Sequence, residues 1–464
     1  MKLDNSKLIE ELRNELKINL LGNWYPLCLD YKYGGYFSNI SRNWEITSEQ
    51  EKMIVTQARH IWTCAKASKF LGVKNFADFA EHGFKFLEEK MWDHDFGGFF
   101  QIRNHDGELS EVEGLMNEKR MYGNAFAIYG LAALYEINEN GNVLALAQKT
   151  FDWIEQNSFD PKFGGYFQFF TRENSVFDKE SEYKTKATDA IEVGYKDQNS
   201  SIHLMEAYSE LYHVYKSPEL KQKLNGILEL IRDKMTNEKG YLHLFFERDF
   251  TPVSFVNSPK EIREENYRLD HVSFGHDYET AFLMLEASYV LGIEIDTKTL
   301  SVAKKMVDHA LEFGWDKESG GFFEEGYYLS GESKCTIVKD TKNWWAQAEA
   351  MNIFLLMSQI FPSEKKYEEI FYKSWEYIKK WLLHENGGWY WGSLEKEPFY
   401  KTEPEGSIWK GTYHTSRALM NCITMLSDKN TIQDSDFGIG FHEIKTNSDK
   451  FIRHWRNVAS TLKN

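Results

Sequence analysis

Three histidines and two glutamates lie near the starts of apolar, helix-like segments, where they could perform acid/base chemistry. His203 occurs in NSSIHLMEAY, His276 and Glu279 occur in SFGHDYETAFL, Glu349 in WWAQAEA, and His414 in WKGTYHTSRAL. Histidine has an unperturbed pKa of about 6.5, so it can take up or release a proton near neutral pH. A neighbouring carboxylate can orient the ring or bind a hydroxyl group. These residue types therefore favour a reaction that proceeds by proton transfer.

The same segment starts carry further polar and aromatic residues, which we expect to converge on one cavity. Asn199 and His203 are four residues apart and share a helix face, as do His276 and Thr280. Aromatic residues form 16% of the chain, a content that suits a carbohydrate site but equally the core of any large helical protein. The other candidates are Tyr122 and Asn124 in RMYGNAF, Asp277, Trp345, Gln347, Trp409 and Arg417, and Arg59 in TQARHIW, which lies further along its helix.

Motifs and composition disfavour several classes of function. The chain has no H-E-x-x-H motif, no Cys/His pairing with metal-ligand spacing, no phosphate-binding or dinucleotide-binding glycine loop, and no serine nucleophile elbow. We therefore expect neither a metal nor a redox cofactor. The formal net charge of −16 disfavours nucleic acid and anionic membranes, because both attract clustered lysine and arginine.

The cysteines and the N-terminal segment predict a cytoplasmic protein. Cys28, Cys64, Cys335 and Cys422 are scattered without metal spacing, which is typical of reduced, mostly buried thiols. The N-terminal sequence MKLDNSKLIEEL is amphipathic and charged, so we expect no signal peptide. No segment is long and apolar enough to span a bilayer. We expect a monomer or a homodimer.

A turn motif recurs along the chain. An aspartate can close a turn on its own backbone, a glycine pair supplies positive φ angles, and the aromatic pair that follows can form a short strand against the core. The sequence DYKYGGYF at 30–37 returns as DHDFGGFF at 93–100, DPKFGGYF at 160–167 and DKESGGFF at 316–323, with weaker copies at 240–245 and 387–391.

Two helix patterns lie between consecutive copies, which predicts six helical hairpins. The segment at 48–71 opens with a capping box, Ser48-x-x-Glu51, and carries apolar residues at helical spacing, as does the segment at 76–91. Six hairpins can close into a ring without the polar end repeats of an open array. We therefore predict an all-α protein, an (α/α)6 barrel with short β-hairpins in the loops. The remaining predicted helices are 118–137, 141–158, 198–216, 218–235, 276–292, 297–314, 342–361, 364–384, and segments near 5–20 and 411–427.

The repeats predict a single domain. We assign residues 1–428 to the barrel and 429–464 to a polar C-terminal tail of the same domain, with one more helix near 446–461. The loops at 172–195 and 246–272 are long and charged, and such loops in compact folds are commonly functional. The candidate residues stand where loops on one rim lead into a helix.

Six motifs together resemble segments of a known family. They are QARHIW, MYGNAFAIYGL, NSSIHLMEAYSELY, SFGHDYETAFL, WWAQAEA and WKGTYHTSRAL, and they resemble the N-acylglucosamine 2-epimerase superfamily, most of all its cellobiose 2-epimerases. The resemblance extends to about residue 428 and implies an (α/α)6 barrel. The chain departs from the cellobiose-type pattern at Ala346, usually proline, and at Gly411-Thr412, usually Cys-Pro. The resemblance implies that His276 and His414 are catalytic and that the sugar is bound by Arg59, Tyr122, Asn199, His203, Glu279, Trp345 and Trp409.

The resemblance also implies a small-molecule sugar substrate and a sugar 2-epimerase, which inverts C2 of a reducing-end aldose such as that of cellobiose or mannobiose. Two histidines would exchange protons with the two faces of C2 through an enediolate, and Arg59 would stabilise the enediolate oxygen. Glu279 and Glu349 would orient histidines or bind hydroxyl groups.

Two alternatives on the same fold stay open: an aldose–ketose isomerase acting on mannose or fructose, and an N-acylglucosamine 2-epimerase. A glycosidase is a further enzyme class, which would use two carboxylates such as Glu279 and Glu349 and leave the histidines idle. A non-catalytic helical scaffold would not gather histidine, arginine and tryptophan at the helix starts.

Overall fold

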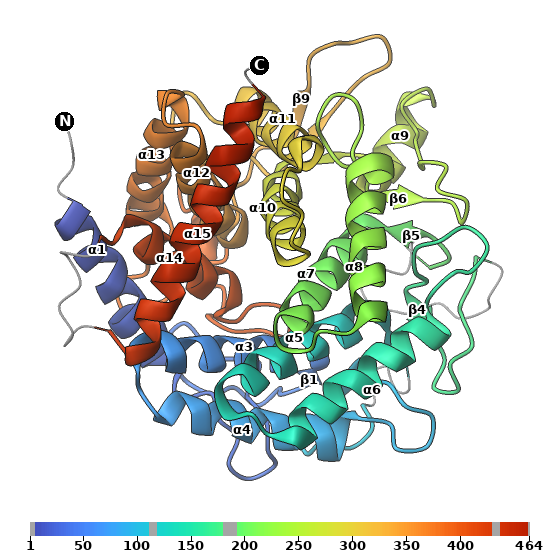
Figure 1. Cartoon of the computed structure of the whole chain (residues 1–464), viewed down its shortest axis with the longest axis vertical. Helices are drawn as coiled ribbons and strands as arrows, with labels where there is room; N and C mark the ends of the chain where they lie inside the picture. Colours follow the sequence, from blue (N-terminus) through green and yellow to red (C-terminus); the bar gives the residue numbers. More distant parts are fainter. Residues whose placement is uncertain (1–4, 111–117, 180–192, 429–436, 463–464) are drawn as a thin grey trace.

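Six helices form the closed inner ring of the protein. The computed structural model describes residues 5–110, 118–179, 193–428 and 437–462. Within them the inner helices contact one another in chain order, and the last contacts the first (Figure 1). These helices are α3 (Ile54–Leu71), α5 (Met121–Asn138), α7 (Gln198–Val214), α10 (Phe274–Val290), α12 (Trp344–Ile360) and α14 (Tyr413–Leu426).

Each inner helix packs against an outer helix, and the sixth pair joins the two ends of the barrel sequence. In that pair α14 packs against α1 (Asn5–Asn14) and its π-helical continuation η1 (Glu15–Leu21), which the short α2 (Gly22–Trp24) follows. The N-terminal segment therefore closes the outer ring, so no repeat lacks a neighbour. The other outer helices are α4 (Asn75–Phe86) with η2 (Leu87–Met91), α6 (Gly141–Asn157), α8 (Pro218–Leu230) with η4 (Ile231–Met235), α11 (Thr297–Phe313) and α13 (Lys365–Trp381).

Short antiparallel strands lie on the rim where the inner helices begin. Four inner helices directly follow a two-residue strand, which pairs with a strand beyond the next glycine turn. This pairing links consecutive repeats and positions the start of each helix. The pairs are β1 (Lys52–Met53) with β2 (Ile102–Arg103), β3 (Lys119–Arg120) with β4 (Phe169–Phe170), β5 (Lys196–Asp197) with β6 (Phe245–Phe246), and β7 (Val272–Ser273) with β8 (Glu325–Tyr327), which also pairs with β9 (Thr336–Lys339).

A buried lysine joins each full copy of the turn motif to the next inner helix. In the first copy the Asp30 carboxylate accepts hydrogen bonds from the backbone N–H groups of Lys32 and Tyr33, which is the turn that the motif predicts. Lys52 Nζ lies 2.7 Å from Asp30 Oδ2 and donates to the carbonyl of Gly34. Each lysine thus ties the residues just before an inner helix to the preceding turn. The same pattern joins Lys119 to Asp93, Lys196 to Asp160, and Lys342 to Asp316.

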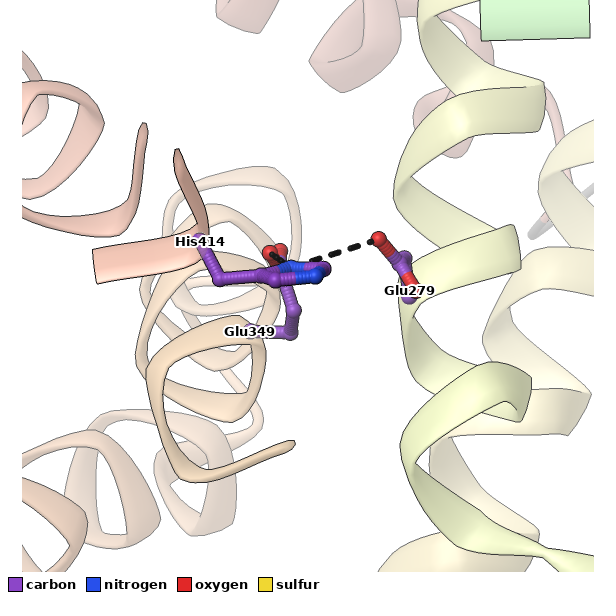
Figure 2. A group of neighbouring side chains, drawn as sticks. All are labelled: Glu279, Glu349 and His414. Carbon is purple, nitrogen blue, oxygen red and sulfur yellow. Dashed lines mark hydrogen bonds and ion pairs between the residues drawn. The ribbon is translucent and has the colours of Figure 1, made fainter. Parts of the chain in front are cut away.

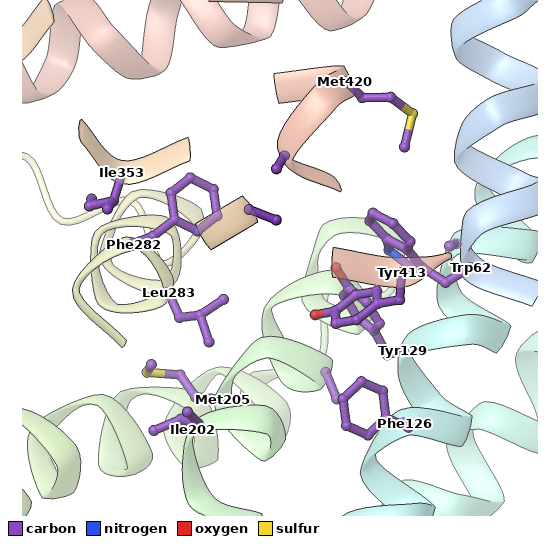
Figure 3. Close-up of a cluster of buried hydrophobic side chains, with 14 of the residues drawn as sticks. Trp62, Phe126, Tyr129, Ile202, Met205, Phe282, Leu283, Ile353, Tyr413 and Met420 are labelled. Carbon is purple, nitrogen blue, oxygen red and sulfur yellow. The ribbon is translucent and has the colours of Figure 1, made fainter. Parts of the chain in front are cut away.

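Helix α15 (Ile439–Thr461) crosses the barrel at the end opposite the strands (Figure 1). It contacts α3, α11, α12 and α14. Phe441 packs on Phe70 near the end of α3, and Phe451 packs on Tyr289 near the end of α10. Between α15 and the rim, buried apolar side chains from all six inner helices fill the barrel (Figure 3).

The predicted helix boundaries differ most from the structure in two places. Helix α3 begins at Ile54, and the pattern from Ser48 to Glu51 caps no helix. The reason is that the amide of Gln50 bonds to the backbone of Ser38 and Asn39 and holds this segment extended. Helix α15 begins before the predicted residue 446.

The two long loops differ in how much of them the structure describes. The loop at 246–272 contains a helix, α9 (Lys260–Asn266), and a 3-10 turn, η5 (Tyr267–Leu269). A second 3-10 turn, η6 (Pro398–Lys401), precedes α14. Residues 180–192 of the other loop and 429–436 of the tail lie outside the described residues.

Two further features concern membrane character and the cysteines. Among the described helices, none combines the length and the apolar character that a membrane crossing requires. The four cysteines, Cys28, Cys64, Cys335 and Cys422, are buried free thiols.

Candidate active site

A cavity of about 500 Å³ opens at the rim where the inner helices begin. The inner helices run in the same direction around the ring, so their N-terminal ends meet at this rim. A cavity of this size lies within the usual range for small-molecule sites. Five candidates from the sequence line it: Tyr122, Asn199, His276, Trp345 and Trp409.

His276 lies in the first turn of α10, and one of its ring nitrogens is hydrogen-bonded. Its Nδ1 lies 2.7 Å from Ser273 Oγ. Its ring packs on Trp345, with 4.9 Å between the ring centroids. Burial lowers the pKa of His276 to about 3, and the nearby His203 and His271 add to the shift. The ring is therefore neutral near pH 7 and can act as a base.

His414 stands at the start of α14, against a pair of carboxylates (Figure 2). Its Nδ1 lies 2.8 Å from Glu349 Oε1 and 3.8 Å from Glu279 Oε1. The His414 ring also packs on Trp345, with 5.5 Å between centroids. Burial holds the pKa of His414 well below its usual value, and the positive charges of Arg59 and Arg417 add to this effect. Both histidines therefore contact one indole ring, from two different helices.

Arg417 joins three buried glutamates that come from three inner helices. Its guanidinium donates to Glu279 Oε1 at 2.5 Å, to Glu349 Oε1 at 2.6 Å, and to Glu206. Burial raises the pKa of Glu279 and Glu349 to about 7, and the charge of Glu349 adds to the shift of Glu279. For Glu206, Arg417 and the hydrogen bond to His203 outweigh burial and lower the pKa to about 2. Near neutral pH this cluster can therefore take up a proton.

Arg59 and His203 extend this cluster toward the cavity. Arg59 Nη2 donates to the hydroxyl of Tyr122 at 3.1 Å, and its guanidinium packs over the ring of Phe126. Arg59 Nε is buried without a hydrogen bond to the described residues. His203 Nδ1 lies 2.8 Å from Glu206 Oε2. Arg59 thus places a positive charge directly behind a residue that lines the cavity.

The group formed by Glu279, Glu349 and His414 also has donor types that could coordinate a metal ion. One atom of each lies within 4.8 Å of the others. However, Arg417 already donates to the facing oxygens of both carboxylates. A divalent cation held between them would lie against the guanidinium, and repulsion between like charges disfavours that arrangement.

The sequence and the fold agree with those of known sugar-processing proteins. A model of the N-acylglucosamine 2-epimerase (GlcNAc 2-epimerase) family matches residues 35–418. The chain belongs to this family. The cellobiose 2-epimerase of Bacteroides fragilis is 27% identical over 428 residues, which cover 91% of this chain and 99% of the relative. The D-mannose isomerase of Marinomonas mediterranea is 22% identical, and the match covers 87% of this chain and 94% of the relative.

A solved structure gives the same result for the fold. Cellobiose 2-epimerase from Spirochaeta thermophila superposes with a TM-score of 0.76 at 27% identity, covering 91% of this chain and 97% of that one. The predicted (α/α)6 barrel and the predicted family are confirmed. This member of the N-acylglucosamine 2-epimerase family is a carbohydrate epimerase or isomerase.

Three polar residues that we expected in the cavity face away from it. Asn124, Asp277 and Gln347 each accept a hydrogen bond from a backbone N–H group beyond a glycine turn, at residues 99, 242 and 322. Consecutive residues on a helix are about 100° apart, so Asp277 points outward when its neighbour His276 points into the cavity. These three side chains therefore anchor the turns and do not line the site.

Of the two departures from the cellobiose-type pattern, one touches the cavity. Ala346 lines it. Thr412 instead bonds through its hydroxyl to Tyr25 and Thr63, and a side chain at Gly411 would meet the ring of His60. The Gly411-Thr412 segment is therefore part of the packing between α14, α3 and the N-terminal segment.

Residues that precede the helix starts, and Glu206 within α7, were not among the candidates from the sequence. Ser273 holds His276, and Glu206 joins His203 to Arg417. Position in the sequence could have identified the residues before the helices, because the residue immediately before four of the inner helices lines the cavity. Those residues are Arg120, Asp197, Ser273 and Asn343, and the loop residues Arg268, His271, Glu324 and Glu325 also line it.

Proposed function

We propose that this family member is a sugar 2-epimerase that inverts C2 at the reducing end of a β-1,4-linked disaccharide such as cellobiose or mannobiose, with His276 and His414 as its acid/base pair. The observation that carries the proposal is that the His276 and His414 rings both pack on Trp345, and that Trp345 and His276 line the cavity. The two histidines come from different helices, so they can reach a bound sugar from different directions.

The chemistry of an aldose explains why two such groups are needed. The C2 proton is acidic only when C1 is an open-chain carbonyl, so the ring must first open. One histidine then takes the C2 proton, and the electron pair of the C–H bond enters an enediolate. The other histidine returns a proton to C2 from the opposite face, and the ring closes as the epimer. Each general acid or base contributes about 10²- to 10⁴-fold to such a step.

The charges around the cavity suit this reaction. The lowered pKa values of His276 and His414 keep both rings neutral near pH 7, so either one can begin as the base. The other ring must take up a proton before it can return one to C2, and Glu279 and Glu349, whose pKa is raised to about 7, can supply that proton. Arg59 is our candidate for stabilising the enediolate oxygen, because a fixed positive charge in a buried site stabilises developing negative charge. We assign Tyr122, Asn199 and His203 to binding sugar hydroxyl groups, and Glu279 and Glu349 to holding His414.

A disaccharide substrate is supported by the aromatic lining and by the relatives. Trp345 packs on both histidines and so belongs to the reacting ring. Trp409 lines the same cavity and can form a stacking surface for a second ring. The Bacteroides relative that matches nearly end to end is a cellobiose 2-epimerase.

The test is to incubate the enzyme with cellobiose, mannobiose, glucose, mannose and N-acetylglucosamine in heavy water. C2 deuteration is followed by NMR, and the products are separated by chromatography. We expect deuterium at C2 and conversion of each disaccharide to its C2 epimer, with monosaccharides turning over more slowly. Activity restricted to the N-acetyl sugar would place the enzyme in the N-acylglucosamine branch and contradict the proposal.

An aldose–ketose isomerase is the second candidate, and the match to the D-mannose isomerase of Marinomonas mediterranea favours it. Isomerisation shares the enediolate but returns the proton to C1. Conversion of mannose mainly to fructose in the same experiment would therefore favour this reaction over epimerisation.

A further inference from the structure

We propose that Ser273 is a positioning residue that holds the His276 ring through both of its protonation states. The inference rests on the proposed function, in which His276 exchanges the C2 proton. Ser273 Oγ lies 2.7 Å from His276 Nδ1. No hydrogen bond within the described residues engages His276 Nε2, and the ring lines the cavity. Ser273 thus secures one ring nitrogen and leaves the other for the substrate.

The hydroxyl of Ser273 does not make the helix-capping hydrogen bond that is usual at its position. Ser273 is the residue before the first turn of α10, where a serine side chain ordinarily accepts a hydrogen bond from the helix backbone. Its side chain makes no such bond. At the equivalent position of the neighbouring inner helices α7 and α12, Asp197 and Asn343 do make it. The one inner helix that carries His276 therefore lacks the cap that both of its neighbours have.

The backbone of Ser273 is held in place by the rim. Ser273 is the second residue of β7 and stands opposite Glu325 in the pairing with β8. It is also buried, with 8% of its surface exposed. Because the strand fixes the position of the hydroxyl, the hydrogen bond to Nδ1 sets the direction of the imidazole ring.

A hydroxyl suits a histidine that must alternate between acid and base. It donates to Nδ1 when that nitrogen is bare, and it accepts from Nδ1 when that nitrogen carries a proton. The ring therefore keeps this bond whether or not Nε2 is protonated. His414 has a different kind of partner. An ionised Glu349 can only accept a hydrogen bond, so this contact requires a proton on His414 Nδ1.

The experiment compares Ser273→Ala, Ser273→Thr and Ser217→Ala. Ser217 is the matched control, because its side chain does cap a helix, by accepting from the backbone N–H of Leu220 at the start of outer helix α8. For each variant kcat and KM on cellobiose and the melting temperature are measured.

We expect Ser273→Ala to lower kcat by about 10- to 100-fold, since a misplaced catalytic group reacts slowly, while KM changes less than about threefold because substrate contacts remain. Its melting temperature should stay unchanged, because no cap is lost. Threonine retains the hydroxyl and is well tolerated in a strand, so Ser273→Thr should recover kcat to within about threefold of the wild type. Ser217→Ala should show the opposite pattern, with a lower melting temperature and an unchanged kcat.

Three results would overturn the inference: a Ser273→Ala enzyme with wild-type kcat, a threonine variant as slow as the alanine one, or a loss of stability in Ser273→Ala that accounts for its loss of activity. The His276→Ala variant separates this inference from the function beneath it. If His276→Ala is inactive and Ser273→Ala is fully active, only the role of Ser273 is wrong. If His276→Ala is itself fully active, the proposed function is wrong.

Discussion

At the residue scale, the two histidines of the site differ in what holds them. A neutral hydroxyl binds His276 and a carboxylate binds His414. A carboxylate can only accept a hydrogen bond, so it requires a proton on the facing nitrogen, whereas a hydroxyl can donate or accept. The pair is therefore asymmetric, although both rings pack on the same side chain, Trp345. Three predictions about the chemistry follow from these contacts.

Replacing either histidine should stop epimerisation without unfolding the protein. His276→Ala and His414→Ala each break the proton path to one face of C2, so kcat should fall by at least about 10²-fold. The control is His94→Ala, because His94 is exposed on a turn at the rim. Circular dichroism checks the fold, and NMR in heavy water checks for exchange of H2 from the surviving face. Wild-type turnover in either variant would exclude that histidine as an acid or base.

The pH dependence of kcat should reflect the carboxylate cluster. The pKa of Glu279 and Glu349 is raised to about 7, so the cluster takes up a proton as the pH falls through this value. His414 then loses its anionic partner, and kcat should fall on the acidic side. Glutamine at position 349 carries no charge at any pH, so Glu349→Gln should lower kcat near neutral pH and weaken this acidic fall. A pH–rate profile measured on both proteins tests this, and an unchanged profile in the variant would contradict it.

Chelators should leave the activity unchanged. Arg417 supplies the positive charge between Glu279 and Glu349, so the cluster needs no added cation. Turnover is compared before and after dialysis against a chelator. A loss of activity that a divalent metal restores would show that the three-residue group binds an ion after all.

At the scale of elements, the buried lysines position the starts of the inner helices. Lys52 is fully buried and bonds to both the Asp30 carboxylate and a turn carbonyl. Removing one partner of a buried ion pair leaves an unpaired charge, which typically destabilises a protein by about 3–5 kcal/mol. The two partners of each ion pair are separated in the sequence by a turn and a loop. Each pair therefore links the end of one repeat to the start of the next.

Lys52→Met should therefore reduce the free energy of unfolding by about 3 kcal/mol or more. The control is Lys32→Met, because Lys32 lies in the same turn but is exposed, and this variant should change stability by less than about 0.5 kcal/mol. Urea denaturation measures both variants. Equal stability of the two would mean that the buried pair contributes no more than a surface charge.

At the scale of the whole molecule, α15 closes one end of the barrel and the candidate active-site cavity lies at the other. Phe441 is fully buried where α15 meets the end of α3. The two ends of the barrel therefore have separate tasks, because the packing under α15 stabilises the ring while the opposite rim carries the candidate chemistry.

Phe441→Ala should lower the free energy of unfolding by about 3–5 kcal/mol, as deletions of buried phenylalanine side chains generally do. kcat should stay close to wild type, because the residue lies at the far end of the barrel from the cavity. Lys450→Ala, on the exposed side of the same helix, is the control. Urea denaturation and turnover on the best substrate are measured together. A kcat that falls with stability intact would mean that α15 also affects the site.

The sequence by itself determined the repeat, the barrel and, except for α3, the approximate starts of the inner helices. These depend on local rules that any short window reveals: an aspartate that closes a turn, a glycine pair with positive φ, and apolar residues at helical spacing. The predicted helix starts led to five candidate residues that line the cavity: Tyr122, Asn199, His276, Trp345 and Trp409. Because the inner helices run in one direction, a position counted from the helix start is also a position relative to the cavity.

Only the tertiary structure decided which polar side chains face the cavity and which stabilise the turns and helices around it. Asp277 is next to His276 in the sequence but anchors a turn outside the inner ring. Arg417 joins Glu206 and Glu349, which lie on separate helices far apart in the chain. The physical reason is that a helix rotates by about 100° per residue and that ion pairs depend on distance in space. Neither the facing direction of one side chain nor the meeting of two distant helices is contained in a local pattern.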